Sequence, residues 1–387
     1  MAQNRKPGFE LVVSAGPHER RHTALSVEIP EALVGEFASA GGAALTSAST
    51  KRALACQVDG ADPGRLWFIV PAMQRGKRMR LTARPSAPAR KGGVRLTKTN
   101  DRVRISVGGA PFTAYHYAGD ALARQYLYPI LGHGGARLTR ECRFEDGPGF
   151  DHKHHKSIWV AHGLVNGADN WAEEPGHAET RHVRFEEVSG GAVLGRIVED
   201  NEWRNAAGQK LLGEHRVIRV YNQPASARCV DFEITFRAGH DSVLFGDTKE
   251  GGLLSVRVNP SMDAPKGTIT NSFGGINEEE AWGKRAHWCD YSGKADGRLV
   301  GIAVFDHPKN PMHPTHWHVR NYGLMTANPF GLSYFDPESG ARGDWLLPAS
   351  GEATFRYRLF IHRGSAEAAD LSDRYSDYVS PPIVDIG

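Results

Sequence analysis

Several short segments of the chain alternate apolar and polar residues with a period of two, which is typical of strands with one buried face. The clearest is Val230–Arg237, in which valine, phenylalanine and isoleucine occupy every second position. Similar alternation occurs in Ala24–Ile29, Val103–Val107 and Phe355–Leu359. Two other runs, Leu66–Val70 and Leu299–Phe305, are apolar almost throughout and predict strands buried on both faces.

Helical periodicity is confined to one segment near the end of the chain, Ser365–Val379, where Leu371, Tyr375 and Tyr378 follow one another at i, i+4 and i+7. The chain also contains 44 glycines and 22 prolines, and residues of this kind separate short strands. Many short strands with frequent turns predict an all-β protein, and we expect an antiparallel β-sandwich. The terminal helix is expected to pack against a sheet.

A basic segment from Arg75 to Arg104 divides the strand-rich regions. It holds eleven lysines and arginines with one acid, Asp101, and its Pro- and Gly-rich middle, 83–93, has the composition of a linker. We therefore expect a small N-terminal β region, residues 1–90, and a larger sandwich domain, residues 91–387. No aromatic residues interleave these charges, so the segment is more typical of a solvated loop than of a nucleic-acid site.

The composition is that of an ordinary globular protein, with 387 residues, 40% hydrophobic residues, 24% charged residues and a formal net charge of +3. So small a charge gives no reason to expect a nucleic-acid partner. No apolar run approaches the roughly 20 residues that span a bilayer, and no signal-peptide pattern follows Met1. We expect a cytoplasmic protein with no membrane partner, whose four cysteines are free thiols. The oligomeric state stays open.

Histidines concentrate in two distant stretches. Four of the 18 histidines fall within Asp151–Gly163, and the second stretch, Phe305–Arg320, contains the run His-Pro-Thr-His-Trp-His. The residues concerned are His152, His154, His155 and His162 in the first stretch and His316 and His318 in the second. Imidazole titrates near neutral pH and can donate, accept or bind metal, so these stretches indicate a site rather than a polar turn beside a packed tryptophan. We expect His152 and His316 to line one pocket, with Glu250 on its wall.

Two further segments, Phe245–Gly252 and Asn277–Tyr291, combine charges with turns or aromatic rings. Their chemically active members are Asp247, Lys249 and Glu250 in the first and Trp282, Lys284 and Arg285 in the second. Carboxylates on a tight turn can act as acid, base or hydroxyl-binding groups. Tryptophan with cations suits the ring face and the hydroxyls of a sugar. A charged hairpin turn and a loop with a core tryptophan are the alternatives.

Together these segments resemble a bacterial family of unknown function, DUF6807, often labelled "PmoA family" or methane oxygenase PmoA. The resemblance covers roughly residues 100–365 and rests on Asp151–Gly163, Phe245–Gly252, Trp282–Tyr291 and Phe305–Gly331. Lys153 and Lys156-Ser157 stand where the family pattern has Pro and Arg-Gly, which affects the local loop shape. The N-terminal 90 residues resemble no family. The resemblance implies a sandwich like that of galactose mutarotases and polysaccharide lyases, and a role in sugar catabolism.

We therefore hypothesise a carbohydrate-active enzyme that cleaves a glycosidic bond by hydrolysis or elimination. Its substrate would be a small molecule or an oligosaccharide, and its acid–base chemistry would need no cofactor. The expected catalytic residues are His152, His155, Asp247, Glu250, His316 and His318. The expected substrate-binding residues are Trp159, His162, Lys249, Trp282, Lys284, Arg285, Trp317 and Arg320. An unperturbed imidazole predicts a limb near roughly pH 6–7 in the pH–rate profile.

Three alternatives are open. A sugar epimerase or mutarotase needs only one acid and one base. A divalent metal ion held by His152, His154, His316 and His318 would make the protein a metal-dependent hydrolase, because the members of each pair lie at i, i+2 and face one side of a strand. A non-catalytic carbohydrate-binding accessory protein would bind sugar without turnover.

Overall fold

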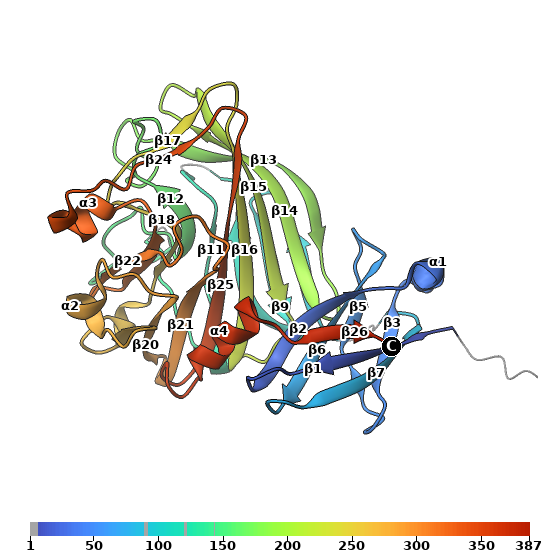
Figure 1. Ribbon diagram of the computed structural model, residues 1–387. Helices are drawn as coiled ribbons and strands as arrows, with labels where there is room; N and C mark the ends of the chain where they lie inside the picture. The colour runs from blue at the N-terminus through green and yellow to red at the C-terminus, as the bar shows by residue number, and fades with distance from the viewer. Residues whose placement is uncertain (1–6, 89–91, 120–121, 143) are drawn as a thin grey trace, which may run out of the picture.

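A computed structural model describes residues 7–88, 92–119, 122–142 and 144–387. Two eight-stranded antiparallel sheets pack face to face and dominate the molecule (Figure 1). The first, here the β12 sheet, has the strand order β22 (His316–Arg320), β23 (Leu324–Asn328), β18 (Gly251–Arg257), β12 (Ile158–His162), β11 (Tyr126–Leu127), β10 (Ala110–His116), β9 (Arg102–Val107) and β8 (Val94–Lys98). The second, here the β16 sheet, has the order β13 (Glu179–Ser189), β14 (Leu194–Arg204), β15 (Lys210–Tyr221), β16 (Ala227–Arg237), β25 (Glu352–Arg363), β21 (Arg298–Asp306), β20 (Trp288–Ala295) and β19 (Thr268–Asn271).

The sandwich forms because alternate residues of both sheets face one common core. Val160 and Val256 enter this core from the β12 sheet, and Ile218, Phe232 and Leu359 enter it from the β16 sheet. The antiparallel β-sandwich expected from the sequence is therefore confirmed. Strand β21 is buried on both faces as predicted, since its residues contribute to the central core on one side and to a second apolar cluster on the other.

The N-terminal strands form a smaller region with a hydrophobic core of its own. Its five-stranded sheet has the order β26 (Ile383–Ile386), β1 (Phe9–Ser14), β7 (Arg78–Pro85), β3 (Ala43–Ser47) and β4 (Ala53–Leu54), and its three-stranded sheet has the order β2 (Arg20–Glu28), β6 (Arg65–Met73) and β5 (Cys56–Val58). Strand β26 comes from the end of the chain, so both ends of the described chain meet in this region. The boundary expected at residue 90 lies outside the described residues.

The helix predicted near the C-terminus is present as α4 (Leu371–Val379). Leu371 and Tyr375 pack against Phe305 and Phe360 on the outer face of the β16 sheet, in a cluster that also includes Trp67 of the N-terminal region. The expectation of one helix alone was wrong. Helix α1 (Glu31–Ala40) buries Phe37, which follows Leu33 and Val34 at helical spacing in a segment too short for a strong periodicity signal.

The remaining elements are short and lie in the loops of the sandwich. They are β17 (Val243–Phe245), β24 (Trp345–Leu347), α2 (Asn277–Ala281), α3 (Leu332–Phe335) and the 3₁₀ turns His133–Gly135, Pro260–Met262 and Pro337–Ser339. All four cysteines are free thiols. Among the described residues, no helix has the length and apolar character needed to cross a membrane.

The outer faces of the two large sheets have different neighbours. Figure 1 shows the blue N-terminal strands and α4 beside the β16 sheet, and the apolar cluster around Phe305 and Leu371 joins them to it. The β12 sheet instead carries on its outer face the residues that follow, because β12, β18 and β22 bring both histidine stretches to it.

Candidate functional site

The alternation of β12, β18 and β22 decides which site residues face outward. Val160, Val256 and Trp317 belong to the core between the sheets, so their sequence neighbours point to the opposite side. Trp159 accordingly joins a second aromatic cluster on the outer face of the β12 sheet, with Tyr126, Tyr128, Trp171 and Leu324. Arg257 at the end of β18 and His318 in the middle of β22 share this face.

The first histidine stretch forms a tight turn before β12 that is anchored on Arg257. The His155 backbone N–H donates to the His152 carbonyl over 2.8 Å, and His152 has a positive φ of 51°. The Arg257 guanidinium, which is buried, donates one hydrogen bond to His155 Nδ1 and another to Asp151 Oδ1, each 2.6 Å long. This arrangement fixes three imidazoles in ring contact, with centroids 4.9 Å apart for His152–His155 and 4.3 Å apart for His154–His155.

The second histidine stretch meets this turn through Tyr322, which follows β22. Its ring stacks on His152 with centroids 5.0 Å apart, and Arg257 lies over the same ring at 4.7 Å. His318 brings in the third segment, because its Nδ1 lies 2.7 Å from the carbonyl oxygen of Lys249. Three segments that are distant in the sequence thus converge at one place on the outer face.

Two carboxylates at this place are accessible. The side chain of Glu250 is 47% exposed and forms a 3.0 Å ion pair with Lys249 Nζ, and that of Asp151 is 55% exposed and is paired with Arg257 and His152. Burial of the carboxyl group raises the pKa of Glu250, but the Lys249 hydrogen bond and the field of His318 outweigh burial, so the net shift is downward. Glu250 is therefore ionised at neutral pH, and it interacts electrostatically with both His318 and His154.

The imidazoles around Glu250 are neutral. Burial, followed by the positive charge of Arg320, lowers the pKa of His318 to about 4. Burial and Arg124 lower the pKa of His154 to about 4, and burial and Arg257 hold the pKa of His155 well below its ordinary value. Because burial disfavours the charged ring, a pH–rate limb set by His318 would lie below the pH 6–7 expected from an unperturbed imidazole.

The hydrogen bonds of two imidazoles fix opposite tautomers. A guanidinium only donates, so Arg257 requires a lone pair on His155 Nδ1 and leaves the proton on Nε2. A carbonyl only accepts, so His318 Nδ1 carries the proton and its Nε2 carries a lone pair. Neither Nε2 has a hydrogen-bond partner within the described residues. The cluster therefore contains one neutral imidazole fixed as a donor and one fixed as a base.

His316 and Asp247 have other partners. His316 stacks on Phe335 with centroids 5.5 Å apart, and its electrostatic neighbours are Arg285 and Asp336. Phe335 also contacts the His318 ring at 6.2 Å, so His316 lies beside His318 on β22, and a pocket shared by His152 and His316 stays a prediction. Asp247 is buried, and its carboxylate accepts hydrogen bonds from the backbone N–H groups of Ser333 and Gly343, so it holds loops together.

Several expected binding residues also have structural contacts. Trp317 lies in the central core, where its indole N–H donates to the Ala286 carbonyl, so it does not form part of the outer surface. His162 faces the same core and donates from Nε2 to the Gly246 carbonyl over 2.8 Å. Arg285 donates to the carbonyls of Pro314 and Met312, while Lys284 is exposed.

Arg320 and Trp282 lie near the cluster, at the end of β22. The Arg320 guanidinium lies 5.5 Å from the Trp282 ring centroid and is paired with Glu278. Tyr322 interacts electrostatically with Arg320 and Glu250, which places this pair beside the imidazoles. An aromatic face and a cation next to a carboxylate are suited to the ring and hydroxyls of a sugar.

The sequence analysis did not assign roles to Arg257, Asp151 and Tyr322, and it considered His154 only as a metal ligand. Tyr322 lies directly after the second histidine stretch, which is a signal that was available. Arg257 follows an apolar strand 102 residues after His155, and no local pattern connects the two.

The four histidines considered as metal ligands do not form a preassembled ligand set. Among the residues that the structure describes, one group of three potential ligands has its donor atoms within 4.8 Å of one another, namely Glu186, Asp200 and His215 on the β16 sheet. Asp200 of that group is already paired with Arg184.

Comparison with known proteins identifies the family. The model of the family of unknown function DUF6807 matches residues 102–376. The chain belongs to this family. The match contains both histidine stretches and all three segments that converge at Glu250. A search of curated proteins found no match.

Two solved structures from Enterococcus faecalis resemble the chain distantly. One is described as a protein in glycosyl hydrolase family 38 (TM-score 0.47, 12% identity) and the other as an alpha-mannosidase from strain V583 (TM-score 0.46, 11% identity). The alignments cover 98% of this chain but 47% and 46% of those proteins, so this DUF6807 member spans less than half their length.

Proposed function

We propose that this protein is a carbohydrate-active enzyme that cleaves a glycosidic bond by proton transfer between fixed imidazoles. The observation that carries the proposal is the cluster of a base, His318 Nε2, and a donor, His155 Nε2–H, beside the ionised Glu250. Glu250 stabilises a proton on His318 because the two interact electrostatically. Tyr322, Trp282 and Arg320 supply ring faces and a cation for the sugar.

The chemistry favours elimination over hydrolysis. A typical glycosidase uses two carboxylates on either side of the scissile bond. Near the imidazoles, Glu250 is paired with Lys249, Asp151 is paired with Arg257, and Asp247 is held by backbone N–H groups, so two unengaged carboxylates are not found there among the three. One base that removes a C–H proton and one acid that protonates the leaving oxygen are sufficient for elimination.

A sugar epimerase or mutarotase is the second candidate. The same donor and base, fixed on opposite tautomers, can move a proton from one position to another without breaking a glycosidic bond. The two candidates differ in their products.

Incubation with neutral and uronate-containing oligosaccharides, followed by three readouts, tests the proposal. Elimination yields an ultraviolet-absorbing unsaturated product together with a new reducing end, whereas hydrolysis yields the reducing end alone. Epimerisation yields solvent-deuterium incorporation or a new anomer or epimer without cleavage, visible by NMR. A sugar that binds but gives none of these signals would identify a carbohydrate-binding protein and contradict the enzyme.

The pH dependence offers an independent check. His318 works as a base only when neutral, and its pKa is lowered to about 4, so kcat/KM should be level near neutral pH and fall on the acid side towards pH 4. A limb at the ordinary imidazole pKa would show that the titrating base is a different group.

A further inference from the structure

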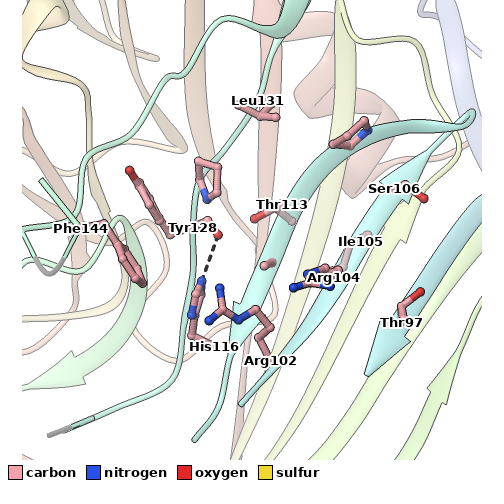
Figure 2. A pocket seen from close by; sticks show the side chains of 13 residues that line it. Thr97, Arg102, Arg104, Ile105, Ser106, Thr113, His116, Tyr128, Leu131 and Phe144 are labelled. Atoms are coloured by element: carbon pink, nitrogen blue, oxygen red, sulfur yellow. Dashed lines mark hydrogen bonds between the residues drawn. The ribbon is translucent and has the colours of Figure 1, made fainter. Parts of the chain in front are cut away.

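A cavity lies on the outer face of the β12 sheet, towards the opposite end from the imidazoles. Its volume is about 510 Å³. Its lining includes Arg102, Arg104, Thr113, His116, Tyr128 and Phe144. Figure 2 shows the guanidinium groups of Arg102 and Arg104 turned towards the His116 ring, with the rings of Tyr128 and Phe144 on the other side.

The cavity has one uncompensated positive charge. Arg102 donates from Nε to Asp101 Oδ2 over 2.8 Å, so these two charges offset each other. Arg104, two residues further along β9, makes no side-chain hydrogen bond or ion pair within the described residues. The next carboxylate, Glu145, is paired with Arg137 and accepts the Tyr128 hydroxyl. Arg104 therefore favours an anionic ligand, and its planar guanidinium matches a carboxylate.

The opposite wall is aromatic and accessible. Tyr128 and Phe144 stack with ring centroids 5.5 Å apart and an interplanar angle of 6°. Phe144 is 48% exposed, so its ring is accessible from the cavity that it lines. Such a face packs against the C–H groups of a sugar ring.

A buried hydroxyl provides an independent indication of a polar ligand. Thr113 lines the cavity and is 6% exposed, and its Oγ1 has no hydrogen-bond partner. Buried hydroxyls are normally satisfied, so Thr113 Oγ1 is a potential partner for a polar atom of a ligand in the cavity. Thr97 and Ser106 add two further hydroxyls to the lining.

We infer that this cavity is a subsite for a carboxylate-bearing sugar ring, and that the substrate is an acidic oligosaccharide. The inference about the substrate rests on the proposed function. An aromatic row connects the two ends of the sheet, because His116 stacks on Tyr126 at 4.7 Å and Tyr126 clusters with Trp159 beneath the imidazoles. Arg104 on β9 and His318 on β22 are six positions apart in the sheet, or about 29 Å, so the substrate must be an extended oligosaccharide to reach both places.

Calorimetric titration with uronate oligosaccharides and with neutral oligosaccharides of equal length tests the subsite. Arg104→Gln should weaken uronate binding about tenfold or more and remove most of its salt dependence, while neutral binding stays unchanged. Arg104→Lys should retain part of the affinity because it keeps the charge but not the planar fork. The matched control is Arg80→Gln, at an exposed arginine of β7 in the N-terminal region.

Equal uronate affinity in Arg104→Gln and the unchanged protein would overturn the subsite, as would equal binding of neutral and acidic oligosaccharides by the unchanged protein. His318→Asn separates this outcome from the fate of the proposed function, because it should lose turnover and keep uronate affinity. A protein that binds uronates through Arg104 but turns over none of them keeps the subsite and loses the enzyme. Turnover that depends on His318 but not on Arg104 would support the proposed enzyme and contradict the subsite.

Discussion

Both large sheets carry ion pairs on their outer faces, but the two faces differ in how they hold certain histidines. On the β16 sheet, charged side chains form cross-strand pairs near water, such as Arg184 with Asp200 at 2.6 Å and Arg237 with Glu352 at 2.9 Å. Even His215 there is paired with Asp200 through Nδ1 at 3.1 Å. On the β12 sheet, His155 and His318 are buried as neutral rings, and the Nε2 of each has no partner within the described residues.

The paired charges of the β16 sheet contribute to the fold, whereas His155 and His318 keep a ring nitrogen available to a ligand. Exposed pairs cost little to maintain and stabilise little, so many arrangements of them are equivalent. Burying an imidazole opposes its protonation, and an Nε2 with no partner leaves a lone pair or an N–H unused, which gives the fold no benefit. Such groups are the mark of a site, and the comparison can be tested residue by residue.

The largest effect is expected on stability in acid. The pKa of His318 and of His162 is lowered from 6.5 to about 4 by burial, so between these values the unfolded chain binds protons that the folded chain does not. The free energy of unfolding should therefore be complete above pH 6.5 and should fall as the pH drops towards 4. Each fully buried ring contributes up to about 3 kcal/mol to this fall. Urea unfolding at stepped pH measures it.

One variant shows whether His318 contributes to the acid effect. His318→Asn should flatten the dependence of unfolding free energy on pH by up to one proton. Equal pH dependence in His318→Asn and the unchanged protein would falsify the neutral, buried state of His318.

The next effect concerns turnover. Asparagine can keep a donor where His318 Nδ1 bonds the Lys249 carbonyl, and it removes the Nε2 lone pair, so His318→Asn should lower kcat by about 10²-fold or more with the fold intact. His215→Asn is the matched control, because His215 also bonds through Nδ1, and its kcat should stay within about twofold. Comparable losses in both variants would mean that the two faces do not differ in the way described.

The smallest effect concerns the arginine that supports the turn. Arg257→Gln loses the donors to His155 and Asp151 and should lower kcat about tenfold, because the imidazoles shift while KM changes less. Arg184→Gln, at an exposed pair on the β16 sheet, should change neither kcat nor the unfolding midpoint measurably. Steady-state kinetics and thermal unfolding of both variants test this prediction. An unchanged kcat in Arg257→Gln would show that Arg257 contributes to packing and does not position the imidazoles.

The sandwich and most of its strands were predictable because strand patterning is local. The alternation in Val230–Arg237 and the apolar run in Leu299–Phe305 both correspond to strands of the β16 sheet. Helix α1 was missed because its apolar residues span little more than one turn. The histidine stretches, Glu250 and the family resemblance likewise came from short motifs with unusual composition.

By itself, then, the sequence determined the fold class, the family and the segments in which chemistry is concentrated. The tertiary structure alone decided which members of those segments meet. The strand order β22-β23-β18-β12 places β22, β18 and β12 in one sheet, so it brings His318 to the Lys249 carbonyl and Arg257 to His155. The alternation of side chains along β22 and β12 places Trp317 and His162 in the core. Burial lowers the pKa of His318 from its ordinary value. Strand pairing and burial depend on residues far apart in the sequence. Short motifs and hydrophobic periodicity are local, so they could not predict which residues meet or which are buried.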